Sequence, residues 1–259
     1  MESTSFYMTL PSSTRSGDDM YPKNTASAFQ VRLPKTMYLK NKYEVALAEI
    51  MYPHTWSTFN KNEDYTFYYT HLDGDTVRLS IDKGYYFKMD ALLREMNQAF
   101  QRQMDDKLQN DIVFHYNGVT GRVKLFMKGG YTVWFSEGLA DILGFKSGEV
   151  YRASSSPEVS IMSPFIADIT RGFNSLYIYC SICEPQIVGD AYVPLLRTVF
   201  LSGRHGQMIN HIYDAPHYVP VNTDTFDTIE INIKNDMNEN VSFKTGKVIC
   251  KLHFRQKAL

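Results

Sequence analysis

The 259-residue chain lacks several features that would define a class of protein at once. It has only three cysteines, and this odd number in a long chain excludes a disulfide-stabilised scaffold. Its first residues do not place positive charge before an apolar core, so we expect no secretory signal and synthesis in a reducing compartment. Its longest apolar stretch, Tyr43–Tyr52, contains Glu44 and Glu49 and is too short to span a membrane.

An excess of basic charge is also missing. The chain carries 27 Lys and Arg against 28 Asp and Glu, which gives a net charge of −1, and no basic block stands at either end. Proteins that coat nucleic acid neutralise its phosphates with surplus Lys and Arg. We therefore expect no direct contact with nucleic acid.

Motifs for nucleophilic or phosphate chemistry are absent too. The chain has no G-x-S-x-G elbow and no G-x-x-x-x-G-K-[ST] loop. Cys180 and Cys183 form a C-x2-C pair, but a structural zinc needs a second pair of ligands. Cys250 stands alone and is expected to point inward with Val248 and Leu252. We interpret all three cysteines as core residues.

Three histidines, His205, His211 and His217, are spaced by six residues. A cupin holds its metal through an H-x-H motif, and the chain contains none. A cupin-like metal enzyme therefore stays the least favoured alternative. We expect a protein that is not an enzyme, and we assign no catalytic, cofactor-binding or metal-binding residues.

What the chain has in quantity is strand-forming sequence. Aromatic residues make up 14%, with 18 Tyr and 16 Phe, and these fit half-buried pleated surfaces. Apolar and polar residues alternate in many short runs near both ends of the chain. Eight strands in two sheets are typical of a jelly roll, and neither end has enough strands alone. The expected strands lie near residues 5–10, 27–33, 43–52, 174–183, 195–201, 207–213, 226–234 and 246–255.

The middle of the chain has a different period. From Met89 to Met104 apolar residues recur at helical spacing, and Asn117–Gly121 joins two alternating runs as a hairpin would. The fold class is therefore mainly β: a single jelly-roll β-sandwich with an inserted α+β domain. The expected boundaries are 1–58 plus 165–259 for the jelly roll, 59–150 for the insert and a Ser/Pro-rich linker at 151–164.

Several strings near both ends resemble a known family, the minor capsid (penton) proteins of Polinton/Maverick elements and adintoviruses. The resemblance covers about 150 residues and is looser between 60 and 150. The strings that carry it are Phe6–Ser12, Leu33-Pro34, Glu44–Trp56, Glu184–Arg197, Pro216–Val221, Phe226–Ile231 and Gly246–Arg255.

The resemblance implies a structural protein of the virion, made inside the host cell. Five copies would form a homopentamer that closes each fivefold vertex of an icosahedral shell built of double jelly-roll major capsid proteins. The family has no catalytic residues to transfer to this chain. An alternative reading gives the insert a binding role toward a host receptor or glycan, through tyrosines such as those in Tyr65–Tyr69 and Tyr85-Tyr86. Sheet packing is the simpler use of these aromatic residues.

Overall fold

The structure, a computed structural model, describes residues 5–13, 20–40, 42–59, 64–72, 74–105, 107–153, 157–171 and 173–257. The chain divides into two compact units. Met1–Trp56 and Phe173–Leu259 form one, which we call the jelly-roll unit. Ser57–Gly172 form the other, which we call the inserted unit.

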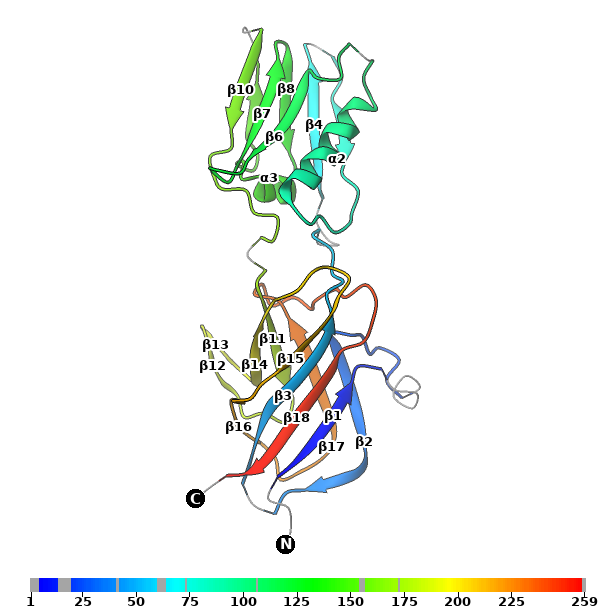
Figure 1. Cartoon of the computed structure of the whole chain (residues 1–259), viewed down its shortest axis with the longest axis vertical. Coiled ribbons are helices and arrows are strands. Elements are labelled where there is room, and N and C mark those ends of the chain that lie inside the picture. Colours follow the sequence, from blue (N-terminus) through cyan, green and yellow to red (C-terminus); the bar gives the residue numbers. More distant parts are fainter. Residues whose placement is uncertain are drawn as a thin grey trace. The chain divides into compact units, whose positions relative to one another are not determined.

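The jelly-roll unit contains two antiparallel sheets (Figure 1). The first has the order β1-β18-β3-β15, and the short β16 also pairs with β3. Its strands are β1 (Ser5–Pro11), β18 (Ile249–Gln256), β3 (Tyr43–Pro53), β15 (Met208–Ile212) and β16 (Val219–Pro220). The second has the order β14-β11-β17-β2. Its strands are β14 (Leu195–Phe200), β11 (Ser175–Cys180), β17 (Thr225–Lys234) and β2 (Ala28–Tyr38).

This strand order confirms the predicted jelly roll. Numbered along the jelly-roll unit alone, the eight long strands lie as 1-8-3-6 in one sheet and 5-4-7-2 in the other, so both chain ends contribute to both sheets. The alternating residues of β11 and β18 bury one side of each strand in a single core, which includes Ile178, Leu252 and Phe254. A small hairpin, β12 (Gln186–Val188) and β13 (Ala191–Val193), forms a sheet of its own.

The inserted unit lies in the chain between β3 and β11 and has two further antiparallel sheets. One contains β5 (Val77–Ser80), β4 (Thr66–His71), β8 (Tyr131–Phe135) and β9 (Val150–Arg152). The other contains β10 (Glu158–Met162), β7 (Arg122–Lys128) and β6 (Ile112–Asn117). Its helices are α2 (Met89–Gln101) and α3 (Glu137–Leu143). The mixed composition is that of the predicted α+β insert.

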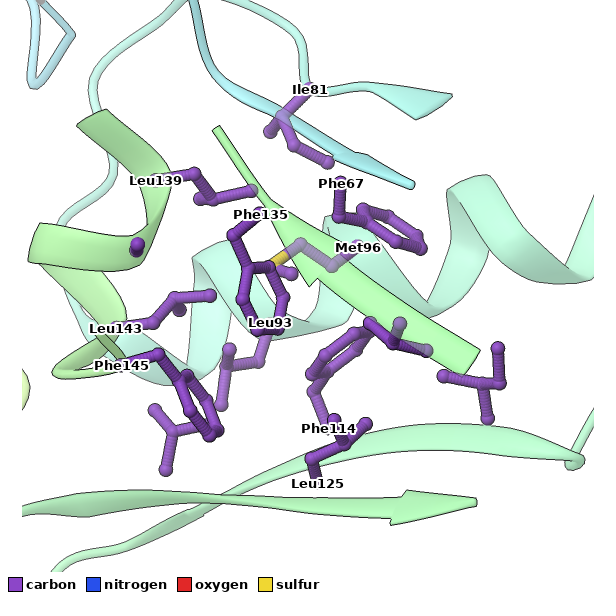
Figure 2. Packing of buried hydrophobic residues seen from close by; sticks show 14 of the residues in the cluster. Phe67, Ile81, Leu93, Met96, Phe114, Leu125, Phe135, Leu139, Leu143 and Phe145 are labelled. Atoms are coloured by element: carbon purple, nitrogen blue, oxygen red, sulfur yellow. The ribbon is translucent and has the colours of Figure 1, made fainter. Parts of the chain in front are cut away.

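The apolar stripe of α2 packs into the core of the inserted unit, as expected. Leu93 and Met96 face Phe67 and Phe114 in this core (Figure 2). The Asn97 side chain joins α2 to β6, since it donates to the Phe114 carbonyl at 3.0 Å and accepts from the Phe114 amide at 2.9 Å. The stripe is therefore used inside the unit.

The structure differs from the sequence interpretation over 151–164. Instead of a linker, this stretch contains the end of β9 and all of β10, which pairs with β7 from Glu158 to Met162. Val159 and Ile161 alternate with polar residues and pack against the core, and this period outweighs the Ser/Pro content. Residues 165–172 also group with the inserted unit. Residues 154–156 lie outside the described part of the chain.

Candidate functional site

The three cysteines lie in the core of the jelly-roll unit, as predicted. Cys180, Cys183 and Cys250 are all free thiols and are buried. A hydrogen bond with Cys180, and then burial, raise the pKa of Cys183 far above its ordinary value, and burial does the same for Cys250. Thiols held in this form are poor nucleophiles and poor metal ligands, because both roles require the thiolate.

The three histidines spaced by six residues, for which no metal site was predicted, lie in different settings. His205 and His217 are exposed in loops, whereas His211 lies on β15. The Nε2 atom of His211 is 3.3 Å from both the Tyr52 hydroxyl and the Ser202 hydroxyl. Within the described residues, no group of three or more His, Cys, Asp or Glu side chains could hold a metal ion.

A cavity of about 680 Å³ lies beside α3 in the inserted unit, with Ser136, Glu137 and Phe145 in its lining. Within it, Arg171 Nε donates to Asp141 at 2.9 Å. Asp64 is bonded to Thr66 and Arg78, whose contacts lower the pKa of its carboxyl group. Asp64, Asp141 and Arg171 are thus already held in local ion pairs.

The outer face of the first jelly-roll sheet carries a stacked group of aromatic and basic side chains. The Tyr7 and His253 rings stack at 4.4 Å, and His253 Nδ1 is 2.7 Å from the Tyr218 hydroxyl. The Arg255 guanidinium lies 3.4 Å from the centre of the Tyr218 ring and also pairs with Glu44. These contacts cover Ala46, which lies opposite His253 in the sheet and is fully buried. Because the Arg255 guanidinium is paired with Glu44, another protein surface can pack against this group without burying an unpaired charge.

A second aromatic pair lies on the outer face of the inserted unit. Tyr68 on β4 and Trp134 on β8 are cross-strand partners, with ring centres 5.4 Å apart and planes only 7° from parallel. Their neighbours Phe67, Val133 and Phe135 point the other way into the core. Of the expected tyrosines, Tyr65 and Tyr69 are core residues, so the alternation of the strand sorts the aromatic residues of this stretch onto two faces.

Within the jelly-roll unit, most of the exposed large apolar side chains lie on edge strands or on the β12–β13 hairpin. The β12–β13 hairpin presents Ile187 at 81% exposure and its cross-strand partner Tyr192 at 68%. This hairpin was not among the strands predicted from the sequence. Its signal was present, because Gly189-Asp190 separates two short apolar runs and Gly189 takes the positive φ of 62° that such turns use.

No helix in the described part of the chain combines the length and the hydropathy that crossing a bilayer requires. No protein-family model matches the sequence. No curated protein matches it at a significant level.

Among solved structures, the chain has a similarity of fold to a known protein. The mavirus penton protein aligns with a TM-score of 0.53 and 12% identity, over 98% of this chain and 99% of that one. The D2–D3 domains of the flagellar cap protein FliD from Escherichia coli align with a TM-score of only 0.19 and 11% identity, over 97% and 100% of the two chains. The first of these is a likeness of fold along the whole chain.

Proposed function

We propose that this chain is a penton-type minor capsid protein of the Polinton/Maverick and adintovirus kind. It acts as a homopentamer at the fivefold vertices of an icosahedral virion whose shell is built of double jelly-roll major capsid proteins. The observation that carries the proposal is the likeness of fold to the mavirus penton protein, which spans both units of the chain. The role is structural and needs no catalytic group or cofactor.

Physical features of the chain support this role. A net charge of −1 keeps electrostatic repulsion among neighbouring copies low. A ring of five requires a heterologous interface, in which two different surfaces of each subunit meet. Exposed apolar side chains occur on more than one edge of the jelly-roll unit, as such an interface needs.

The mass of the purified full chain in solution tests the proposal. We expect a species of five times the 29.9-kDa subunit mass, by native mass spectrometry or by sedimentation equilibrium. Co-expression with a double jelly-roll major capsid protein should place the chain at the vertices of assembled shells in particle images. A chain that stays monomeric at all concentrations and never joins a shell would overturn the proposal.

The Tyr68–Trp134 pair favours a second role for the inserted unit, the binding of a host glycan. Flat aromatic faces on an open sheet offer the apolar contact that a sugar ring needs, and the exposed guanidinium groups of Arg78 and Arg152 supply donors on neighbouring strands. Replacing Trp134 and Tyr68 by serine should abolish binding to a glycan array and leave the pentamer intact. Val119→Ser, at a fully exposed turn, is the matched control. Unchanged glycan binding by the double variant would exclude this role.

A further inference from the structure

The edge strands of the jelly-roll unit fall into two sets at opposite ends of its sheets. Strands β14 and β15 end the two sheets on one side, and β2 and β1 end them on the other. The Arg197 guanidinium on β14 lies 3.6 Å from the centre of the Tyr213 ring, which directly follows β15, so these two strands share one side of the sandwich. The strand orders then place β1 and β2 together on the other side.

The first side, which we call the β14–β15 edge, is rich in exposed apolar side chains. Those with most of their surface free are Phe200 on β14, Ile212 on β15, and Ile187 and Tyr192 on the β12–β13 hairpin, which directly precedes β14 and is bonded to it through the Gln186 side chain and the Leu195 carbonyl. With Met208 included, the five side chains leave on the order of several hundred Å² of apolar surface, since the two aromatic ones alone, Tyr192 and Phe200, offer roughly 150–250 Å² each before their partial burial. A standard protein–protein interface buries about 800 Å² on each partner, so this edge supplies a large part of one.

Strand β15 also carries neither of the residue types that most directly guard an exposed edge. Soluble proteins guard such strands with Lys, with Pro or with a covering segment. The sequence of β15, Met-Ile-Asn-His-Ile, contains no charged residue and no proline. The nearby β12–β13 hairpin has only three residues in each strand and pairs with no other strand of the described chain. Isolated two-stranded hairpins are marginally stable, so the β12–β13 hairpin gains stability when a partner surface covers it. The exposed edge of β15 gains from the same cover.

The opposite side, the β1–β2 edge, carries a smaller aromatic set. Tyr7 on β1 is 60% exposed and Tyr38 at the end of β2 is 71% exposed. Tyr7 is held in place by its stacking on His253, so its free face is rigid and costs little entropy to cover. The two edges are thus both apolar, different in composition and located on opposite sides of the same sandwich.

We propose that the β14–β15 edge of one copy of this chain packs against the β1–β2 edge of the next copy. The occupant of each edge is therefore a second copy of the chain, with Ile187 and Tyr192 on one side of the contact and Tyr7 and Tyr38 on the other. This inference rests on the proposed homopentamer and identifies its contact surfaces. Two different surfaces on one subunit propagate head to tail, and such a contact closes into a ring when its rotation matches the fivefold axis, whereas a self-complementary contact would stop at a dimer.

Two paired variants of the full chain test this contact. Variant A is Ile187→Glu with Tyr192→Glu, and variant B is Tyr7→Glu with Tyr38→Glu. All four positions are exposed, so the subunit should stay folded, which its circular dichroism and melting temperature report. Variant A carries its glutamates on the β14–β15 edge and variant B carries them on the β1–β2 edge. The altered edge of A and the altered edge of B therefore repel each other. Val119→Glu, at an exposed turn of the inserted unit, is the control.

We expect variants A and B to be monomers when alone, and the wild type and the Val119→Glu control to be pentamers. An equimolar mixture of A and B should give a dimer and nothing larger, because only one junction has two intact edges. Pentamers of either variant, or a dimer formed by one variant alone, would overturn the head-to-tail contact and leave the pentamer itself standing. A wild-type chain that is only monomeric would instead overturn the proposed function.

Discussion

Single residues of the jelly-roll unit link its stability to pH. Burial lowers the pKa of His54, His211 and His253 below the ordinary value of 6.5, with smaller contributions from His205 on His54 and from Arg255 on His253. As the pH falls through 6.5 the unfolded chain takes up protons before the folded one does. The contribution of these neutral histidines to stability is therefore complete above pH 6.5 and is lost below it.

We predict that the free energy of unfolding of the jelly-roll unit decreases between pH 7 and pH 5, measured by urea denaturation at a series of pH values. His211→Gln should flatten part of this dependence, because the amide can still bond with the Tyr52 and Ser202 hydroxyls and does not titrate. His115→Gln, at an exposed position of the inserted unit, is the control and should leave the dependence unchanged. A wild-type stability that does not fall toward pH 5 would contradict the prediction.

At the scale of elements, sequence period predicted most of the fold. All eight expected jelly-roll segments contain strands. Each side of these strands faces either the core or solvent along its length, so apolar and polar residues alternate in a way that the sequence shows. Phe226 shows where period alone was insufficient. It shares the spacing of the outward residues of β17, yet it is buried, because a register shift between Phe226 and Thr228 turns the strand there.

The parts of the fold that were not predicted depend on contacts between residues that are far apart in the sequence. The Ser/Pro-rich stretch near 158–162 becomes a strand because β7 offers it an edge to pair with, and composition does not report such an edge. The exposed edge residues were not predicted as a site for a related reason. Ile187 and Tyr192 resemble any strand residues in sequence, and only the finished sheets show that the hairpin pairs with no other described strand.

The end of α3 permits a sharp test of a glycine helix cap. Gly144, which ends this helix, has a φ of +75°, and a Cβ atom there would lie 2.4 Å from the Phe165 carbonyl oxygen. Gly148 has a similar φ of +74° with open space around it, and Gly118 has open space without a positive φ. Comparing the three glycines therefore separates the cost of a left-handed backbone from the cost of a clash between the added Cβ atom and a neighbouring residue.

We predict little change in stability for Gly118→Ala and a loss of about 1–2 kcal/mol for Gly148→Ala, which is the cost of a left-handed conformation with a Cβ. Gly144→Ala should cost more than Gly148→Ala, because the neighbouring backbone must also move. Chemical denaturation of the three full-length variants measures the series. Equal losses for Gly144→Ala and Gly148→Ala would show that the Phe165 contact has no effect.

At the scale of the whole molecule, the described residues form two hydrophobic cores with no buried residue in common. Among these residues, the buried members of the inserted core lie between Phe59 and Ala167, and those of the jelly-roll core lie outside this segment. A domain of about 100–150 residues with its own core is of the commonest size and can fold alone. We therefore expect residues 57–172, expressed by themselves, to give a cooperatively folded protein.

The full chain should accordingly unfold in two separate transitions. Leu93→Ala removes a buried side chain from the inserted unit and Leu252→Ala removes one from the jelly-roll unit. Each should cost about 2–5 kcal/mol, because a cavity adds to the lost burial. Calorimetry should show each substitution lowering only the transition of its own unit. If a single transition moved with both substitutions, the two cores would be energetically coupled and the expectation of independent folding would be wrong.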